Sequence, residues 1–139
     1  NRDAYREKFL RYRTYHGCAM PLHHQHASAA AWADESHVRA NRDAYREKFR
    51  TVLAILGDCL EVEAPDAGFY LWPRTPIADT DFARELFARE HVTVLPGRYL
   101  AREQAGLNPG EQRVRMALVA TLEECVEAAH RIRRCVESL

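Results

Sequence analysis

Two arginines spaced two residues apart are the side chains in this sequence best suited to binding chemistry. Arg113 and Arg115 lie in the largely apolar run 113–120, which we predict to be a strand, so both point to the same face. A guanidinium can grip a carboxylate through two parallel hydrogen bonds. Arginines that face water on an edge strand, or that pair with Glu111 or Glu123, are nevertheless the commoner outcome. The pattern alone therefore favours solvated arginines.

Three histidines near the N-terminus raise the question of a metal site. On a helix His23 and His26 are neighbours, with His24 between them. No Cys, Asp or Glu lies near enough in sequence to complete the three or four ligands that a metal requires. We therefore expect polar residues in a first helical turn and no metal site, and the roles of these histidines stay open.

The remaining reactive side chains are few. Of the 20 basic residues, 18 are arginines and two are lysines, Lys8 and Lys48, so a mechanism that needs a lysine has only these candidates. The cysteines are widely spaced and form no CxxC motif, which favours reduced, partly buried thiols in a cytoplasmic protein. They are Cys18, Cys59, Cys125 and Cys135.

A nine-residue sequence occurs twice. NRDAYREKF fills positions 1–9 and again 41–49, and the identity stops immediately afterwards. Solenoid repeats keep their period over several imperfect copies, so this is not a repeat protein. We assign no function to the first copy. Because an identical sequence already has a place in the fold, the first copy is a candidate for a swapped contact with a second chain.

Hydrophobic periodicity predicts helices alternating with short strands. A helix to about residue 16 is followed by one uninterrupted helix over 22–56, ended by Gly57. Strands are predicted at 60–63, 69–72, 92–95 and 113–120. A helix over 79–90 should take Asp79, Thr80 or Asp81 as its N-cap, and Thr121 should cap the closing helix. The expected apolar stripe of that helix is Leu122, Cys125, Val126, Ala129, Ile132 and Val136.

These elements predict an α/β chain of the α+β kind, in which a long N-terminal helix leads into a small mixed sheet of about four strands packed by helices. We expect the domain organisation 1–20, 21–58 and 59–139. A helix as long as the second part typically bridges two bodies, here the parts 1–20 and 59–139.

Composition narrows the class of protein further. The 139 residues carry 20 Lys and Arg against 20 Asp and Glu, and 47% are hydrophobic. The balanced charge argues against a nucleic-acid partner. A mean hydropathy of −0.46 without a long apolar run argues against a membrane span. We expect a soluble, cytoplasmic protein.

Several segments, taken in order, resemble the C-terminal part of the fold-type I, class I/II pyridoxal-phosphate aminotransferases. The resemblance covers about residues 9–139, and RYRTYHGCAM is most similar to the bacterial succinyldiaminopimelate aminotransferases. The segments that carry it are FLRYRTYHGCAM with Pro21 and Gln25, PDAGFYLW at 65–72, VTVLPG at 92–97, and Gly110 through Arg115-Met116-Ala117.

The resemblance implies a role for one arginine. In this family the stretch is the small domain with its connecting helix, and Arg115 would bind the α-carboxylate of the substrate, whereas Arg113 keeps its solvated interpretation. Pro96-Gly97 would shape the loop after its strand. The parent enzyme, a cytoplasmic homodimer with a large pyridoxal-phosphate domain, would transfer an amino group between glutamate and an N-succinylated 2-amino-6-oxo acid.

The resemblance also implies what this chain lacks. The family's Schiff-base lysine lies upstream in a Ser-x-x-Lys context, which neither Lys8 nor Lys48 has. The acidic partner of the pyridine nitrogen and an Asn-Pro segment are absent as well. Since the cofactor's chemistry needs both the lysine and the acid, we expect no catalytic and no cofactor-binding residue here, and no transaminase activity from this chain alone.

Three alternatives remain open at the level of sequence. The parent could be an aspartate, alanine or aromatic aminotransferase. It could be a regulator that uses an aminotransferase-like region to bind an effector. It could also be a purely structural or interaction domain.

Overall fold

The computed structural model describes residues 2–17 and 19–139, which divide into two units, Asn1–Arg39 and Ala40–Leu139. The N-terminal unit holds α1 (Arg2–His16) and α2 (Leu22–Ala33), and none of their described residues is buried. Its apolar side chains therefore form no core among the described residues. The expectation of a partly buried thiol at Cys18 falls outside the described residues.

The prediction of one uninterrupted helix over 22–56 is wrong. α2 ends at Ala33, and α3 (Ser36–Leu56) begins three residues later. At the break, the Asp34 carboxylate accepts hydrogen bonds from the backbone N–H and the hydroxyl of Ser36, at 2.9 and 2.5 Å. These bonds also lower the pKa of the Asp34 carboxyl group. A side chain that bonds nearby backbone offers the chain an alternative to helix, which sequence periodicity does not register.

The C-terminal unit contains a small antiparallel sheet, and the predicted α+β class is confirmed. Within the described residues the strands are β1 (Tyr70–Leu71), β2 (Leu95–Pro96) and β3 (Val114–Ala117), in the order β1-β3-β2. Both pairings are antiparallel, so the expectation of a mixed sheet with about four strands is corrected. The predicted strand 60–63 forms no ladder; the Glu61 carbonyl accepts a hydrogen bond from the Arg74 N–H at 3.0 Å.

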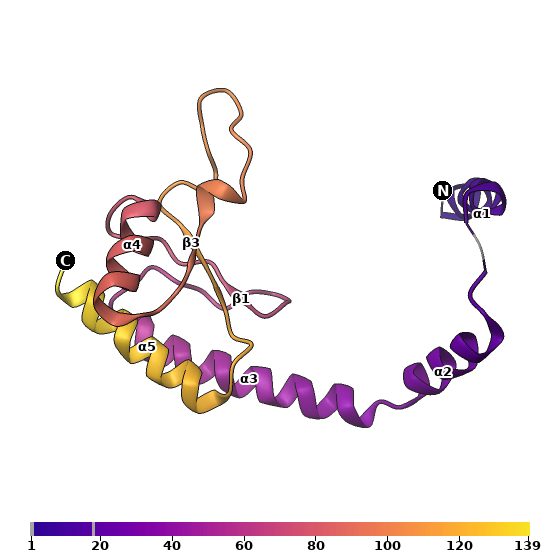
Figure 1. The fold of residues 1–139 in the computed structure, drawn as a ribbon, viewed down its shortest axis with the longest axis horizontal. Helices are drawn as coiled ribbons and strands as arrows, with labels where there is room; N and C mark the ends of the chain where they lie inside the picture. The colour runs from indigo at the N-terminus through magenta and orange to yellow at the C-terminus, as the bar shows by residue number, and fades with distance from the viewer. Residues whose placement is uncertain (1, 18) are drawn as a thin grey trace. The chain divides into compact units, whose positions relative to one another are not determined.

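Alternation along β3 separates a covered face of the sheet from an open one. Val114 and Met116 are buried, Arg115 is half-buried and Ala117 is exposed. The C-terminal half of α3, α4 (Asp79–Glu90) and α5 (Leu122–Glu137) contribute to the same core as the buried strand residues (Figure 1). Core residues from these elements are Val52, Leu56, Leu71, Phe82, Leu86, Val114, Met116, Cys125, Ala129, Ile132 and Cys135.

Helices α4 and α5 confirm most of what periodicity predicts for them. Thr121 caps α5 in a reciprocal capping box: its hydroxyl accepts from the Glu124 N–H, and the Glu124 carboxylate accepts from the Thr121 N–H. Of the expected α5 stripe, Cys125, Ala129 and Ile132 are buried. The cap expected for α4 is wrong, because Ala78 occupies that position without a side-chain bond and the Asp79 carboxylate is used elsewhere.

Three of the cysteines are free thiols, as expected. Cys125 and Cys135 are buried and Cys59 is half-buried. Burial raises the pKa of each of the three thiol groups above its usual value. These thiols therefore stay protonated and poorly nucleophilic at neutral pH.

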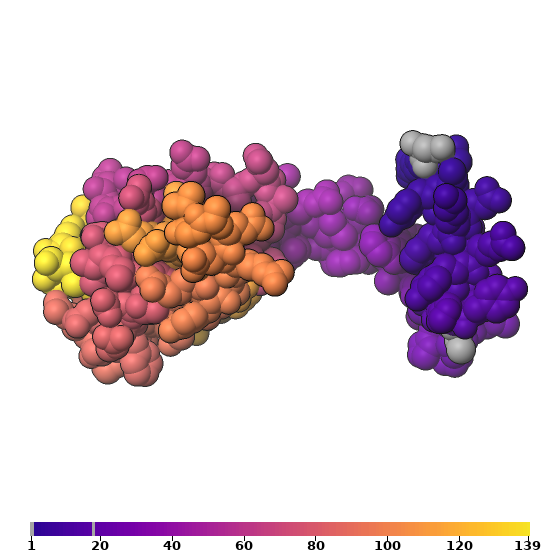
Figure 2. Space-filling view, turned by 90° about the horizontal axis from the view of Figure 1, so that it is seen from above, coloured from indigo at the N-terminus to yellow at the C-terminus, as the bar shows by residue number. Residues whose placement is uncertain are grey.

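A loop between η1 (Gly97–Tyr99) and β3 stands out from the C-terminal unit. Its ribbon, coloured orange, projects away from the helices, and its side chains cover much of the face turned to the viewer in the space-filling view (Figures 1 and 2).

Within the part of the chain that is described, no helix combines the length and apolarity needed to span a bilayer.

Candidate functional site

The open face of the sheet brings together the side chains that sequence analysis singled out. Register places Leu95 of β2 opposite Arg115 of β3, and Tyr70 of β1 opposite Ala117. Because side chains alternate between faces, these residues lie on the side of the sheet away from the core. Arg115 sits on the central strand, so the expectation of an edge strand is wrong.

The Arg115 guanidinium lies over an aromatic ring. Its central carbon lies 4.5 Å from the centroid of the Tyr70 ring. Throughout residues 2–17 and 19–139, no carboxylate forms an ion pair with Arg115 under a 4.0 Å limit. Stacking occupies the face of a guanidinium and leaves the N–H donors on its edge free. The half-buried Arg115 is thus a cation oriented by Tyr70 and without an acidic partner in the described chain.

Arg113 is already engaged with the protein. Its Nη1 donates to the Trp72 carbonyl oxygen at 3.0 Å, and its Nη2 lies 3.8 Å from the Glu61 carboxylate. The expected partners Glu111 and Glu123 are therefore replaced by Glu61, which the segment after α3 brings to this face. A hollow of about 310 Å³ opens beside it. Its lining residues are Glu61, Glu63, Ala64, Pro65, Tyr70, Trp72 and Arg113.

Two glycines cross at the base of the projecting loop. The Gly97 N–H donates to the Arg113 carbonyl oxygen at 2.7 Å. A Cβ on Gly97 would clash with the Gly110 carbonyl oxygen, and a Cβ on Gly110 would clash with the Gly97 backbone. Only glycine permits so close an approach of two backbones. Pro96-Gly97 thus sets the start of the loop, as the sequence analysis expects.

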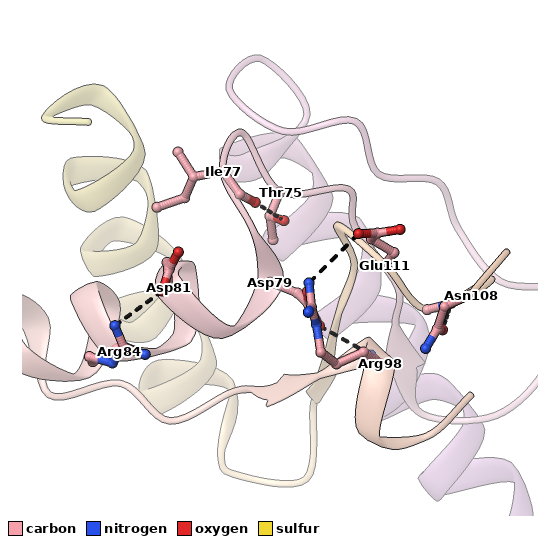
Figure 3. A network of polar contacts seen from close by, with 9 residues as sticks. Thr75, Ile77, Asp79, Asp81, Arg84, Arg98, Asn108 and Glu111 are labelled. Atoms are coloured by element: carbon pink, nitrogen blue, oxygen red, sulfur yellow. Dashed lines mark hydrogen bonds and ion pairs between the residues drawn. The ribbon is translucent and has the colours of Figure 1, made fainter. Parts of the chain in front are cut away.

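An ion pair with a buried carboxylate holds Arg98, the residue that follows this crossing (Figure 3). The Asp79 side chain is fully buried, its Oδ1 accepts from Arg98 Nε at 2.7 Å, and its Oδ2 accepts from the Arg98 backbone N–H at 3.1 Å. Arg98 also lies 3.9 Å from the Glu111 carboxylate. Sequence reasoning missed this pair, because the two residues lie 19 positions apart in a pattern that has no periodicity.

The pair shifts the ionisation of Asp79. Burial alone would raise the pKa of its carboxyl group, but the hydrogen bonds and charge of Arg98 outweigh burial and lower it. Since the pKa in the fold lies below the value of about 3.9 for an unfolded Asp, the pair stabilises the fold above that value. This stabilisation is lost as the pH falls through the folded pKa.

The histidines are placed on α2 and do not converge on a site. His23, His24 and His26 are exposed, and the rings of His23 and His24 are 4.3 Å apart. Among the described residues, no group of three or more His, Cys, Asp or Glu side chains is placed to hold a metal ion.

The two lysines have different surroundings. Lys48 Nζ donates to the Leu118 carbonyl oxygen at 3.2 Å and lies 4.9 Å from the Tyr45 ring centroid. Lys8 is exposed on α1. Lys48 is thus engaged with the backbone of the C-terminal unit, and Lys8 is open to solvent.

Comparison with known proteins identifies the family. The sequence profile described as "Aminotransferase class I and II" matches residues 8–132. The chain belongs to the class I and II aminotransferases. Membership implies pyridoxal phosphate as the cofactor of the parent protein. Comparison with curated protein sequences finds no significant match.

Solved aminotransferase structures share this fold. An aminotransferase from Neisseria meningitidis is 51% identical, with a TM-score of 0.84, over 91% of this chain and 32% of that chain. A probable N-succinyldiaminopimelate aminotransferase from Thermus thermophilus is 37% identical, with a TM-score of 0.62, over 73% and 26%. An aromatic aminotransferase from Pyrococcus horikoshii is 26% identical, with a TM-score of 0.72, over 82% and 31%. The chain thus spans between a quarter and a third of the length of these aminotransferases.

Proposed function

We propose that this chain is the small domain, with its connecting segment, of a pyridoxal-phosphate-dependent aminotransferase, and that Arg115 binds the α-carboxylate of the substrate. The observation that carries the proposal is the state of Arg115. It is half-buried on the central strand, stacked on Tyr70, and without an acidic partner in the described chain. An unpaired arginine that is partly removed from water costs free energy unless an anion pairs with it. A substrate carboxylate is such an anion.

In this proposal Arg115 binds and orients the substrate. With its ring-facing surface stacked, the guanidinium presents its edge donors for a bidentate bond to a carboxylate. The carboxylate would thereby be fixed in place and in rotation, which aligns the neighbouring carbon for reaction on the cofactor. The cofactor supplies the electron sink for amino transfer, and the large domain of the parent would hold it.

For the substrate we propose amino transfer between glutamate and N-succinyl-2-amino-6-oxopimelate. The support is the decapeptide RYRTYHGCAM together with the likeness to the probable N-succinyldiaminopimelate aminotransferase. Profiling the amino donors and acceptors of the full-length enzyme tests this specificity. A preference for aspartate, alanine or aromatic substrates would replace it.

The first experiment changes Arg115 in the full-length parent. Arg115→Ala should lower kcat/KM for glutamate roughly 10- to 100-fold, because a charge-assisted pair of hydrogen bonds is lost. Arg115→Lys keeps the charge but loses the two parallel hydrogen bonds of the guanidinium. Its kcat/KM should therefore lie between those of the wild type and Arg115→Ala. Arg50→Ala, which removes an exposed arginine of α3 that is 77% accessible, is the control and should leave kcat/KM unchanged. An unchanged KM in Arg115→Ala would overturn the proposal and favour a structural domain.

We also propose that this 139-residue chain does not catalyse transamination by itself. A titration with pyridoxal phosphate should give no visible absorbance band from a lysine adduct, because Lys48 is engaged with Leu118 and Lys8 lies in the exposed α1. Borohydride reduction followed by peptide mapping checks the result. A stable adduct mapped to Lys8 or Lys48 would contradict this proposal.

A further inference from the structure

The proposed function leaves one buried charge without a role. The Asp79 carboxylate is fully buried at the start of α4, and Arg98 satisfies both of its oxygens. Arg98 uses its backbone N–H on one oxygen and its side chain on the other. Asp79 therefore fixes the backbone position of Arg98 as well as its guanidinium.

The fixed backbone of Arg98 leads directly to the central strand. Gly97 precedes Arg98 and donates its N–H to the Arg113 carbonyl oxygen at 2.7 Å. One and two residues before Gly97, the β2 residues Pro96 and Leu95 pair with Val114 and Arg115. The Asp79 carboxylate is thus connected to Arg115 through the backbone of Arg98, Gly97 and the two residues of β2.

The ladder between β2 and β3 is too short to set its own register. β2 has two residues, one of which is Pro96, and proline donates no ladder hydrogen bond. A slip of β2 by one residue would turn its side chains to the other face and place another residue opposite Arg115. A tether outside the ladder would oppose such a slip, and Asp79 is in the position to supply it.

We propose that Asp79 is a positioning residue for Arg115: by holding Arg98, it fixes the register of β2 against β3 and so keeps Leu95 beside Arg115, whose guanidinium lies over Tyr70 of β1. This inference rests on the proposed function of Arg115. Asparagine at position 79 would present one acceptor oxygen where aspartate presents two. Either the backbone or the side-chain bond of Arg98 would then be lost, and the tether would loosen.

The first test separates KM from kcat in the full-length parent enzyme. Asp79→Asn should raise KM for glutamate roughly tenfold, with kcat changed less than KM, because a misplaced guanidinium weakens substrate binding. Asp81→Asn is the matched control: it is the same substitution two residues later in α4, on an exposed carboxylate paired with Arg84 (Figure 3). Its KM should equal that of the wild type.

A second measurement follows the tether itself, without turnover. In Asp79→Asn, hydrogen exchange at the Gly97 amide should become faster, and 2-oxoglutarate, used as the probe ligand, should bind more weakly by calorimetry. Thr121→Ala destabilises the unit through the α5 cap instead, so it should leave both readouts unchanged. Equal KM increases in Thr121→Ala and Asp79→Asn would reduce Asp79 to a structural role and overturn the proposal.

A milder variant covers the case in which Asp79→Asn does not fold. Arg98→Lys retains a cation beside Asp79 and the backbone N–H bond, so its KM should lie near the wild-type value, whereas Arg98→Ala should raise it. Failure of the two proposals is distinguishable. If Arg115→Ala leaves KM unchanged, the proposed function fails; if Arg115→Ala raises KM and the Asp79 and Arg98 variants do not, only the positioning role fails.

Discussion

The two copies of the nonapeptide show one sequence in two environments. Both are helical, residues 2–9 within α1 and residues 41–49 within α3. In the first copy Tyr5 is 76% exposed and Phe9 54% exposed. In the second copy, Tyr45 and Phe49 are partly buried against the core.

The difference between the copies lies in the sequence that follows them. After the second copy, Val52 and Leu56 continue the apolar stripe into the core, and the Tyr45 ring lies 6.2 Å from that of Phe69. After the first copy, α1 continues without any buried residue. Intrinsic propensity is thus enough to make both copies helical, whereas burial is decided by neighbours.

The largest difference between the two nonapeptide copies is expected at their phenylalanines, Phe9 and Phe49. Phe49→Ala should lower the free energy of unfolding of this chain by about 2 kcal/mol, since it removes a partly buried aromatic ring. Phe9→Ala, the same substitution in the other copy, should change it by less than about 0.5 kcal/mol. Urea denaturation of the two variants measures both values. Equal losses would mean that the first copy is also packed, and concentration-dependent losses would indicate the swapped contact with a second chain.

A smaller difference is expected at the lysines. Lys48→Met should lower the free energy of unfolding by about 1 kcal/mol, because the hydrogen bond to the partly buried Leu118 carbonyl is lost. Lys8→Met should have no measurable effect, since Lys8 is exposed. Methionine keeps most of the side-chain length, so the comparison isolates the amine. If the two variants are equally stable, the Lys48 bond contributes nothing and the comparison is weakened.

Sequence periodicity predicts long elements whose pattern lies within the element itself. The bounds of α4 and the cap and stripe of α5 follow from residues within each helix. The break at Asp34 does not, because it depends on a hydrogen bond to Ser36 that competes with an otherwise regular helical pattern. The sheet is harder still, since strands of two residues are too short for alternation to define their ends or direction.

The candidate site shows the same limit. Alternation correctly places Arg113 and Arg115 on one face, but by itself it favours solvated arginines for both. Only the resemblance to a family distinguishes Arg115 from Arg113, and only the structure shows that Glu61 and the Trp72 carbonyl engage Arg113. The ion pair of Asp79 with Arg98 cannot be predicted from the sequence, because an aspartate at the start of a helix is expected to cap its own helix.

The crossing of Gly97 and Gly110 also makes the projecting loop a tolerant place for added sequence. The two ends of the loop approach each other through backbone at Gly97 and Gly110, and Asp79 holds Arg98 next to this crossing. Closing a flexible loop of twice the length costs roughly 0.6 kcal/mol more. A peptide tag or a natural insertion placed near Leu107, which is 75% exposed, would therefore leave β3 where it is. The loop can diverge in length while the strand behind it keeps its alignment.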